Sequence, residues 1–155
     1  MNVPLKTLTD DVRTRYERDG YVIVRHAVGD ELIRTAERHL RWTLDQFPDA
    51  TPEQVHRKPL WRTDPFYLHL ARQPGPVRIA REILGPDLAL FAAGYIVKEP
   101  GHSTAVLWHQ DGNYWPLDPM EVCTLWLAIS PSTPETGCMR VIPGTQHDTL
   151  QPHRA

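Results

Sequence analysis

The stretch "VLWHQDGNYWP", residues 106–116, places a histidine and an aspartate two positions apart in a run rich in apolar and aromatic residues. In a β-strand, residues i and i+2 project from the same face, roughly 6.5 Å apart along the chain. His109 and Asp111 can therefore converge on one ion, with Trp108 and Gln110 on the opposite face. Imidazole and carboxylate ligands suit Fe(II), Mn(II) and Zn(II). The same spacing is common at strand ends and turns, so a plain turn stays open as the alternative.

The residues around this stretch predict a sheet. After Gly85 the period of the apolar residues changes from about 3.6 to about 2. Turn-rich segments separate the predicted strands, which are residues 88–98, 105–109, 121–129 and 138–142. Helices followed by sequential strands are typical of an α+β fold, here an antiparallel sandwich or barrel under packing helices. These strands alone are too few to close a sandwich.

The first half of the chain predicts helices. Thr9 is the expected N-cap of the first helix and Gly20 its end, while Pro48 ends the second. Residues 21–24 form an apolar, β-branched run typical of a short strand, and residues 48–64 read as a polar loop. The expected helices are residues 8–20, 30–47, 65–72 and 75–85. We therefore expect one domain over residues 1–155, mainly helical over 1–86, with the first strands of a sheet over 87–155.

Composition narrows the function class. With 155 residues, 41% hydrophobic and 23% charged, and a net charge of −2, the chain is typical of one globular domain or most of one. No basic stripe points to nucleic acid, and no apolar run is long enough to cross a bilayer. The N-terminus lacks the apolar segment of a signal peptide, and Cys123 and Cys138 read as thiols in a reducing cytoplasm. We expect a cytoplasmic protein whose partner is a small-molecule substrate.

Two further segments of the sequence, together with the motif "WHQDGNYW", indicate a protein family. "IVKEPG" (residues 96–101) lies upstream, and "TLWLAISPSTPETGCMRVIPGTQH" (residues 124–147) lies downstream. Together they resemble the phytanoyl-CoA dioxygenase family, and "DGYVIV" and "REILGPDLAL" extend the resemblance over nearly the whole chain. The resemblance implies a double-stranded β-helix (jelly-roll, cupin-like) fold, with Fe(II) as cofactor and 2-oxoglutarate as co-substrate.

The resemblance also implies roles for particular residues. His109 and Asp111 match two ligands of the 2-His-1-carboxylate triad that binds non-heme iron. Trp126 matches a tryptophan beside the 2-oxoglutarate pocket, Lys58 a lysine that contacts the co-substrate carboxylate, and His153 a histidine near the pocket. The alternatives without a ligand are a core aromatic for Trp126, a solvated surface charge for Lys58 and a poorly ordered terminal residue for His153.

A second group of residues is expected to contact the substrate. The expected substrate-binding residues are Tyr95, Gln110, Tyr114 and Trp115. Aromatic residues beside a turn also serve as packing, which is the alternative for the three aromatic members of this group.

Two parts of the family's site have no match in this sequence. The resemblance calls for a second histidine ligand and, about ten residues later, an arginine that grips 2-oxoglutarate, both downstream of "PGTQH". His102 and His147 lie in predicted loops, and nothing in the sequence favours either as the ligand. We therefore expect an incomplete dioxygenase portion: a fragment, a truncated reading frame or a degraded paralogue. An exposed sheet edge would make such a chain marginally stable or prone to self-association.

The reaction that the resemblance implies is hydroxylation of a small organic substrate, with consumption of O₂ and release of succinate and CO₂. Asp111 favours hydroxylation or desaturation, since related halogenases carry glycine or alanine at this position. One alternative is a non-catalytic remnant that binds metal weakly or serves as an interaction module. Another is a two-ligand hydrolytic zinc site, although no general base is evident. The identity of the substrate cannot be read from the sequence.

Overall fold

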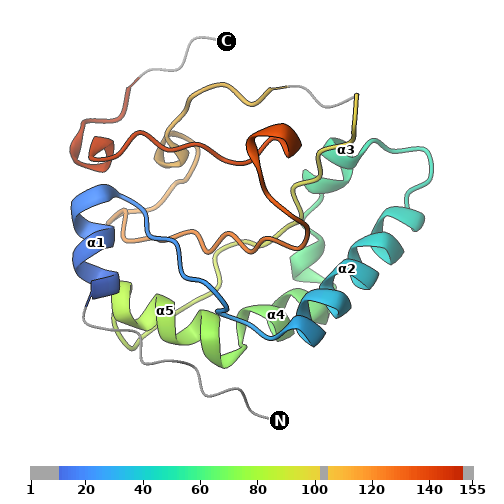
Figure 1. The fold of residues 1–155 in the computed structure, drawn as a ribbon, viewed down its shortest axis with the longest axis horizontal. Coiled ribbons are helices and arrows are strands. Elements are labelled where there is room, and N and C mark those ends of the chain that lie inside the picture. The colour runs from blue at the N-terminus through green and yellow to red at the C-terminus, as the bar shows by residue number, and fades with distance from the viewer. Residues whose placement is uncertain (1–10, 102–104, 152–155) are drawn as a thin grey trace.

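The computed structural model describes residues 11–101 and 105–151, and its regular structure is helical (Figure 1). The α-helices are α1 (Asp11–Asp19), α2 (Asp30–Asp45), α3 (Pro52–His56), α4 (Pro65–Ala71) and α5 (Pro74–Leu84). Short 3-10 helices occur at η1 (Leu60–Arg62), η2 (Asp111–Asn113), η3 (Pro134–Thr136) and η4 (Thr145–His147).

The helices expected from periodicity are confirmed for α1, α2, α4 and α5. Gly20, directly after α1, has φ +80°, and Gly85, directly after α5, has φ +98°. Only glycine adopts such angles at little cost, so both helices end where a glycine allows the chain to turn away. The expected N-cap Thr9 lies outside the described residues.

The prediction of a plain loop over residues 48–64 is wrong in part, because α3 and η1 lie within it. Thr51 and Gln54 form a reciprocal capping box. The backbone N–H of Gln54 donates to Thr51 Oγ1 at 3.3 Å, and the backbone N–H of Thr51 donates to Gln54 Oε1 at 2.8 Å. Pro52 occupies the first turn, where its missing N–H costs nothing. The signal was present as "TPEQ", a start pattern that the polar composition of the segment obscured.

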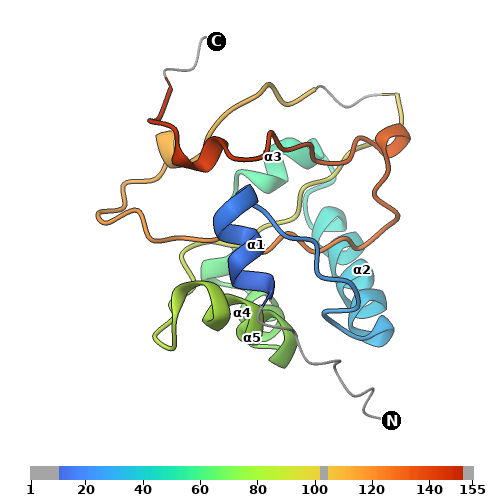
Figure 2. The same ribbon diagram turned by 60° about the vertical axis from the view of Figure 1, so that its left-hand side comes forward.

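The core lies among the helices. Each α-helix contributes at least one buried side chain: Val12, Ala36 and Thr43, Val55, Tyr67 and Ile79, in chain order. Helix α1 packs against α5, and both views show these two helices close together (Figures 1 and 2). Burial of these faces is what the amphipathic spacing of the first half predicted.

The second half crosses the helices as extended segments and turns (Figure 2). No strand is assigned within residues 11–101 or 105–151, so the predicted strands and the jelly roll stay predictions. None of the described residues after Gly85 is fully buried, and large apolar side chains such as Val106, Leu107 and Met139 are exposed. In the part of the chain that the structure covers, no helix combines the length and apolar character needed to span a membrane.

One loop of the second half docks on the C-terminal end of α1. The Gly144 amide donates to the Asp19 carbonyl at 3.1 Å, and Gln146 Nε2 donates to the Glu17 carbonyl at 2.8 Å. His147 Nε2 lies 3.1 Å from the same Glu17 carbonyl. The end of α1 thus supplies carbonyl acceptors for this loop.

Candidate functional site

His109 and Asp111 face each other in the structure. The His109 Nε2 atom lies 3.3 Å from Asp111 Oδ1, and the two side chains are 36% and 50% exposed. Asp111 is the first residue of η2, and the Tyr114 amide closes this turn on the Asp111 carbonyl at 2.9 Å. The two groups are therefore adjacent and open to solvent.

A hydrogen bond orients the imidazole of His109. Its Nδ1 lies 2.7 Å from the Leu107 carbonyl oxygen. A carbonyl can only accept, so Nδ1 carries the hydrogen and donates it. In the neutral ring this leaves the lone pair on Nε2, the atom that faces Asp111. Metal-binding histidines are commonly held in this way, with one ring nitrogen donating to a carbonyl and the other on the metal.

The distance between the two atoms fits a shared metal ion. Two ligand atoms that each lie about 2.1 Å from one ion, at neighbouring corners of its coordination sphere, are roughly 3.0 Å apart. The 3.3 Å between His109 Nε2 and Asp111 Oδ1 is close to that spacing. Without a metal, the same atoms can form an ion pair when the imidazole is protonated. The donor set, one imidazole nitrogen and one carboxylate, is the type that Fe(II) accepts.

The structure places Tyr114 near this pair and Trp115 against another segment. The Tyr114 ring meets the His109 ring edge-on, with centroids 6.2 Å apart. Trp115 packs edge-on against Phe91 at 5.9 Å. Trp126 is 42% exposed.

Gln110 contacts the end of the described chain. Its Oε1 accepts a hydrogen bond from the backbone N–H of Gln151 at 2.8 Å. Asn113 Nδ2 donates to the Gln151 carbonyl at 3.1 Å. Both side chains flank Asp111 in the sequence, so the loop that carries the carboxylate is tied to residue 151.

Tyr95 belongs to the segment after α5, and its side chain lies among the helices. Its hydroxyl is 2.8 Å from His39 Nδ1, and His39 Nε2 is 2.9 Å from Asp64 Oδ2. The His39 ring stacks on Phe66 with centroids 3.9 Å apart. Burial, with smaller contributions from Tyr67 and Asp64, raises the pKa of the Tyr95 hydroxyl far above its ordinary value. Tyr95 therefore stays protonated and acts here as a hydrogen-bonding partner.

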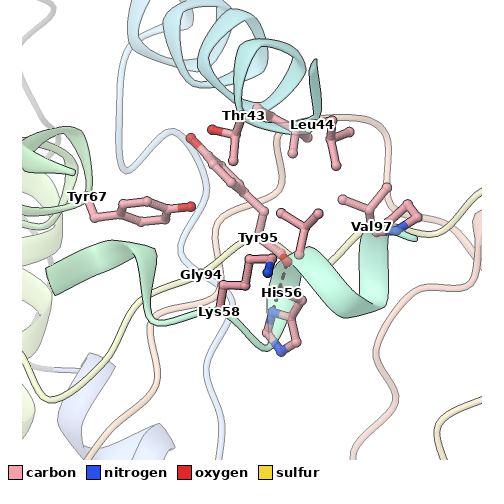
Figure 3. A pocket seen from close by; sticks show the side chains of 11 residues that line it. Thr43, Leu44, His56, Lys58, Tyr67, Gly94, Tyr95 and Val97 are labelled. Carbon is pink, nitrogen blue, oxygen red and sulfur yellow. Dashed lines mark hydrogen bonds between the residues drawn. The ribbon is translucent and has the colours of Figure 1, made fainter. Parts of the chain in front are cut away.

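Lys58 lies at the edge of a small cavity between α2, α3 and the segment around Tyr95 (Figure 3). The cavity holds about 10 Å³, which is the room that one water molecule needs. Lys58 Nζ lies over the Phe47 ring at 4.9 Å, and His56 Nδ1 donates to the Tyr95 carbonyl at 2.9 Å.

Within residues 11–101 and 105–151, no group of three or more His, Cys, Asp or Glu side chains is arranged to bind a metal. The pair of His109 and Asp111 is thus a two-donor site in the described structure. His153, expected near the pocket, and His102 lie outside the described residues. His147 is placed at the end of α1 instead.

Sequence reasoning missed the cluster of His39, Asp64 and Tyr95. The three residues come from α2, the N-cap of α4 and the segment after α5, and 25 and 56 positions separate His39 from its two partners. Each of these residue types is common in helices, caps and loops, so no local sequence pattern predicts the contact. Only the packing of the helices brings the three groups together.

Comparison with known proteins identifies the family. Residues 16–155 match the family model described as phytanoyl-CoA dioxygenase (PhyH). A probable phytanoyl-CoA dioxygenase of Caenorhabditis elegans is 25% identical over 94% of this chain and 55% of its own length. An L-proline trans-4-hydroxylase of Streptomyces griseoviridis is 26% identical over 93% of this chain and 59% of its own length. The comparison with solved structures gave no significant match.

The chain spans a little over half the length of these two relatives. The family match, in contrast, covers all but the first residues of the chain, including the His109 and Asp111 motif. The resemblance seen in the sequence is thereby confirmed: the chain belongs to the phytanoyl-CoA dioxygenase family.

Proposed function

We propose that this chain carries part of the active site of an Fe(II)- and 2-oxoglutarate-dependent oxygenase that hydroxylates a small organic substrate. The observation that supports this most is the pair of His109 Nε2 and Asp111 Oδ1 at 3.3 Å, with the imidazole oriented by the Leu107 carbonyl. Family membership supplies the second support, since the matched proteins are named as a dioxygenase and a hydroxylase.

In this proposal each residue of the pair has a defined task. Asp111 supplies a carboxylate oxygen and His109 supplies Nε2, and the bond from His109 Nδ1 to Leu107 holds the ring so that Nε2 faces the ion. When bound, Fe(II) with 2-oxoglutarate activates O₂, so that oxygen is inserted into a substrate C–H bond while succinate and CO₂ are released. A third protein ligand is needed to complete the triad. Trp126 and Lys58 remain proposed contacts of the co-substrate.

The fold is part of the proposal. We propose that residues 87–155 belong to a jelly roll, because their apolar side chains alternate in the sequence yet none of the described ones is fully buried. In a jelly roll, two sheets stack and each covers the apolar face of the other. The names of the relatives cover an acyl-CoA and a free amino acid, so the proposal names a small organic substrate and no single compound. Tyr114, beside His109, is the best-placed candidate for contact with it.

The proposal is tested by anaerobic titration of the chain with Fe(II) and 2-oxoglutarate. The expected result is a weak visible absorption band from the iron–keto-acid complex, followed by succinate formation when O₂ is admitted. His109→Ala removes one of the two donors, so we expect both signals to disappear. His69→Ala is the matched control, because His69 is exposed on α4 and its ring contacts Gln73 and Phe66, away from the His109 and Asp111 pair. A folded wild-type chain without the band would favour the non-catalytic remnant instead.

A further inference from the structure

The turn that carries Asp111 is held at both ends by one distant residue. Gln110 directly precedes η2, and Asn113 is the last residue of η2. The Gln151 amide donates to Gln110 Oε1 at 2.8 Å, and Asn113 Nδ2 donates to the Gln151 carbonyl at 3.1 Å. Figures 1 and 2 show the last described residues returning alongside this turn. We name this pair of bonds the Gln151 clamp.

The clamp binds the backbone of Gln151 and not its side chain. Gln151 Nε2 is turned to the carbonyl of Thr149 at 3.0 Å. The turn also contacts Leu150, since a Cβ added to Gly112 would lie 3.1 Å from Leu150 Cδ2. Gln110, Gly112 and Asn113 thus lie against residues 150–151. Because only the backbone of Gln151 takes part, any residue other than proline can replace it in the clamp.

Asp111 needs such support because its own turn is short. Within η2 the Asn113 amide donates to the Gln110 carbonyl at 3.1 Å, and the Tyr114 amide to the Asp111 carbonyl at 2.9 Å. A single 3-10 turn has poorer hydrogen-bond geometry than an α-helix, and the Asp111 side chain is half exposed. Asn113 Nδ2 also donates to the Gln110 carbonyl at 3.4 Å within the turn. Bonds from outside the turn add to these and hold the backbone that carries the carboxylate.

We propose that Gln110 and Asn113 are positioning residues, which brace the η2 turn on the backbone of Gln151 and so hold the Asp111 carboxylate toward His109 Nε2 for a metal ion. This inference rests on the proposed function, because it assigns the pair to a metal. It gives Gln110 a different role from the substrate contact expected from the sequence, since its side-chain oxygen is occupied by the Gln151 amide. Groups that orient metal ligands typically change metal affinity by 10- to 100-fold when removed.

The first measurement tests the clamp itself, by hydrogen exchange of the Gln151 amide followed by NMR. Gln110→Met keeps the length of the side chain and removes the acceptor, so exchange is expected to speed up by about tenfold, as for the loss of one hydrogen bond. Gln110→Glu keeps an acceptor oxygen at the same place and should restore protection. Gln151→Ala keeps the backbone groups and should leave the clamp intact. Asn113→Leu tests the second bond by an independent variant.

The second measurement tests the positioning role with Co(II) alone, which binds N and O ligands without turnover and reports its coordination by visible absorption. Gln110→Met and Asn113→Leu are each expected to weaken Co(II) binding by about tenfold. Gln151→Ala should bind Co(II) as the wild-type chain does. The melting temperature of each variant shows whether the chain is folded at the temperature of the titration.

The outcomes separate this inference from the proposed function. Faster exchange with weaker Co(II) binding in Gln110→Met, and neither in Gln151→Ala, supports the inference. Unchanged exchange in Gln110→Met overturns the clamp, and faster exchange with unchanged Co(II) affinity overturns its positioning role, with the proposed metal site left standing in both cases. A protected Gln151 amide in a wild-type chain that binds no Co(II) overturns the proposed function, and the metal role of the clamp with it.

Discussion

His39 has both ring nitrogens engaged. Asp64 Oδ2 lies 2.9 Å from Nε2 and the Tyr95 hydroxyl 2.8 Å from Nδ1, while Phe66 covers one face of the ring. A chain of aspartate, histidine and hydroxyl is the arrangement of a proton relay. Here the pKa of Tyr95 is raised by burial, so the hydroxyl is a poor base or nucleophile. We therefore assign this cluster a structural role, in which partly buried polar groups satisfy one another.

The tyrosines of this region predict how stability depends on pH. Burial, with a smaller contribution from the Asp64 charge, raises the pKa of Tyr67 from 10.0 to about 12. Between pH 10 and about pH 12 the Tyr67 hydroxyl has released its proton in the unfolded chain and retains it in the folded chain. The free energy of unfolding therefore falls as pH rises through this window. The contribution is complete below pH 10, and Tyr95 acts in the same direction.

Tyr67→Phe removes the ionisable hydroxyl. The unfolding free energy of the variant should therefore fall less steeply with rising pH, over the same window, than that of the wild-type chain. Urea unfolding at several pH values across the window measures the two slopes. Equal slopes for the variant and the wild-type chain would show that the Tyr67 hydroxyl is already accessible in the folded state.

At the scale of elements, periodicity located the longer helices and missed the shortest one. Helices α2 and α5 present apolar residues at helical spacing over several turns. Gly85 directly follows α5, whereas α2 ends at Asp45, three residues before Pro48. Helix α3 is too short for any period to be visible, and its existence depends on the cap at Thr51. A helix of this length is stable only with tertiary contacts, which Val55 supplies by burial and His56 by its bond to the Tyr95 carbonyl.

The cap at Thr51 carries a prediction at this scale. Thr51→Ala removes the acceptor for the Gln54 amide, so the chain should lose about 1 kcal/mol of unfolding free energy. Thr51→Ser keeps the hydroxyl and should stay within about 0.5 kcal/mol of the wild-type chain. Urea denaturation of the three proteins measures both differences. A Thr51→Ser variant as unstable as Thr51→Ala would mean that the methyl group, and not the cap, stabilises α3.

At the scale of the whole molecule, the loop of residues 144–147 connects the second half to α1. Gln146 is central to this contact, since it donates to the Glu17 carbonyl and lies against Gly20. A Cβ added at Gly20 would lie 2.5 Å from Gln146 Oε1, at a residue with φ +80°. The first residue after α1 is therefore glycine both for its backbone angle and for the loop that rests on it.

A double-mutant cycle tests this connection. Gly20→Ala should cost about 1 kcal/mol for the positive φ and about 1 kcal/mol more for the displaced Gln146 hydrogen bond. In a Gln146→Ala background the second cost has already been incurred, so Gly20→Ala should lose only the first. Thermal or urea unfolding of the two single variants and the double variant gives the coupling. Additive losses would show that residue 146 does not rest on Gly20 in solution.

The sequence by itself determined the positions of the longer helices, the adjacency of His109 and Asp111, and the family to which the chain belongs. These depend on local features: a helical period, two residues close together in the chain, and a contiguous motif. The pair was expected on one face of a strand, whereas in the structure Asp111 begins the η2 turn. The jelly roll stays a prediction, because alternation indicates which face of a segment is apolar but not which strand pairs with it.

Tertiary structure alone decided which polar groups meet. His39 finds Asp64 and Tyr95, and Gln110 finds the Gln151 amide 41 positions away. No local pattern encodes such a pair, because each partner is an ordinary polar residue until folding brings the two within hydrogen-bond distance. The physical reason is that a polar group withdrawn from water must find a partner, and the packing of the chain determines which one is within reach.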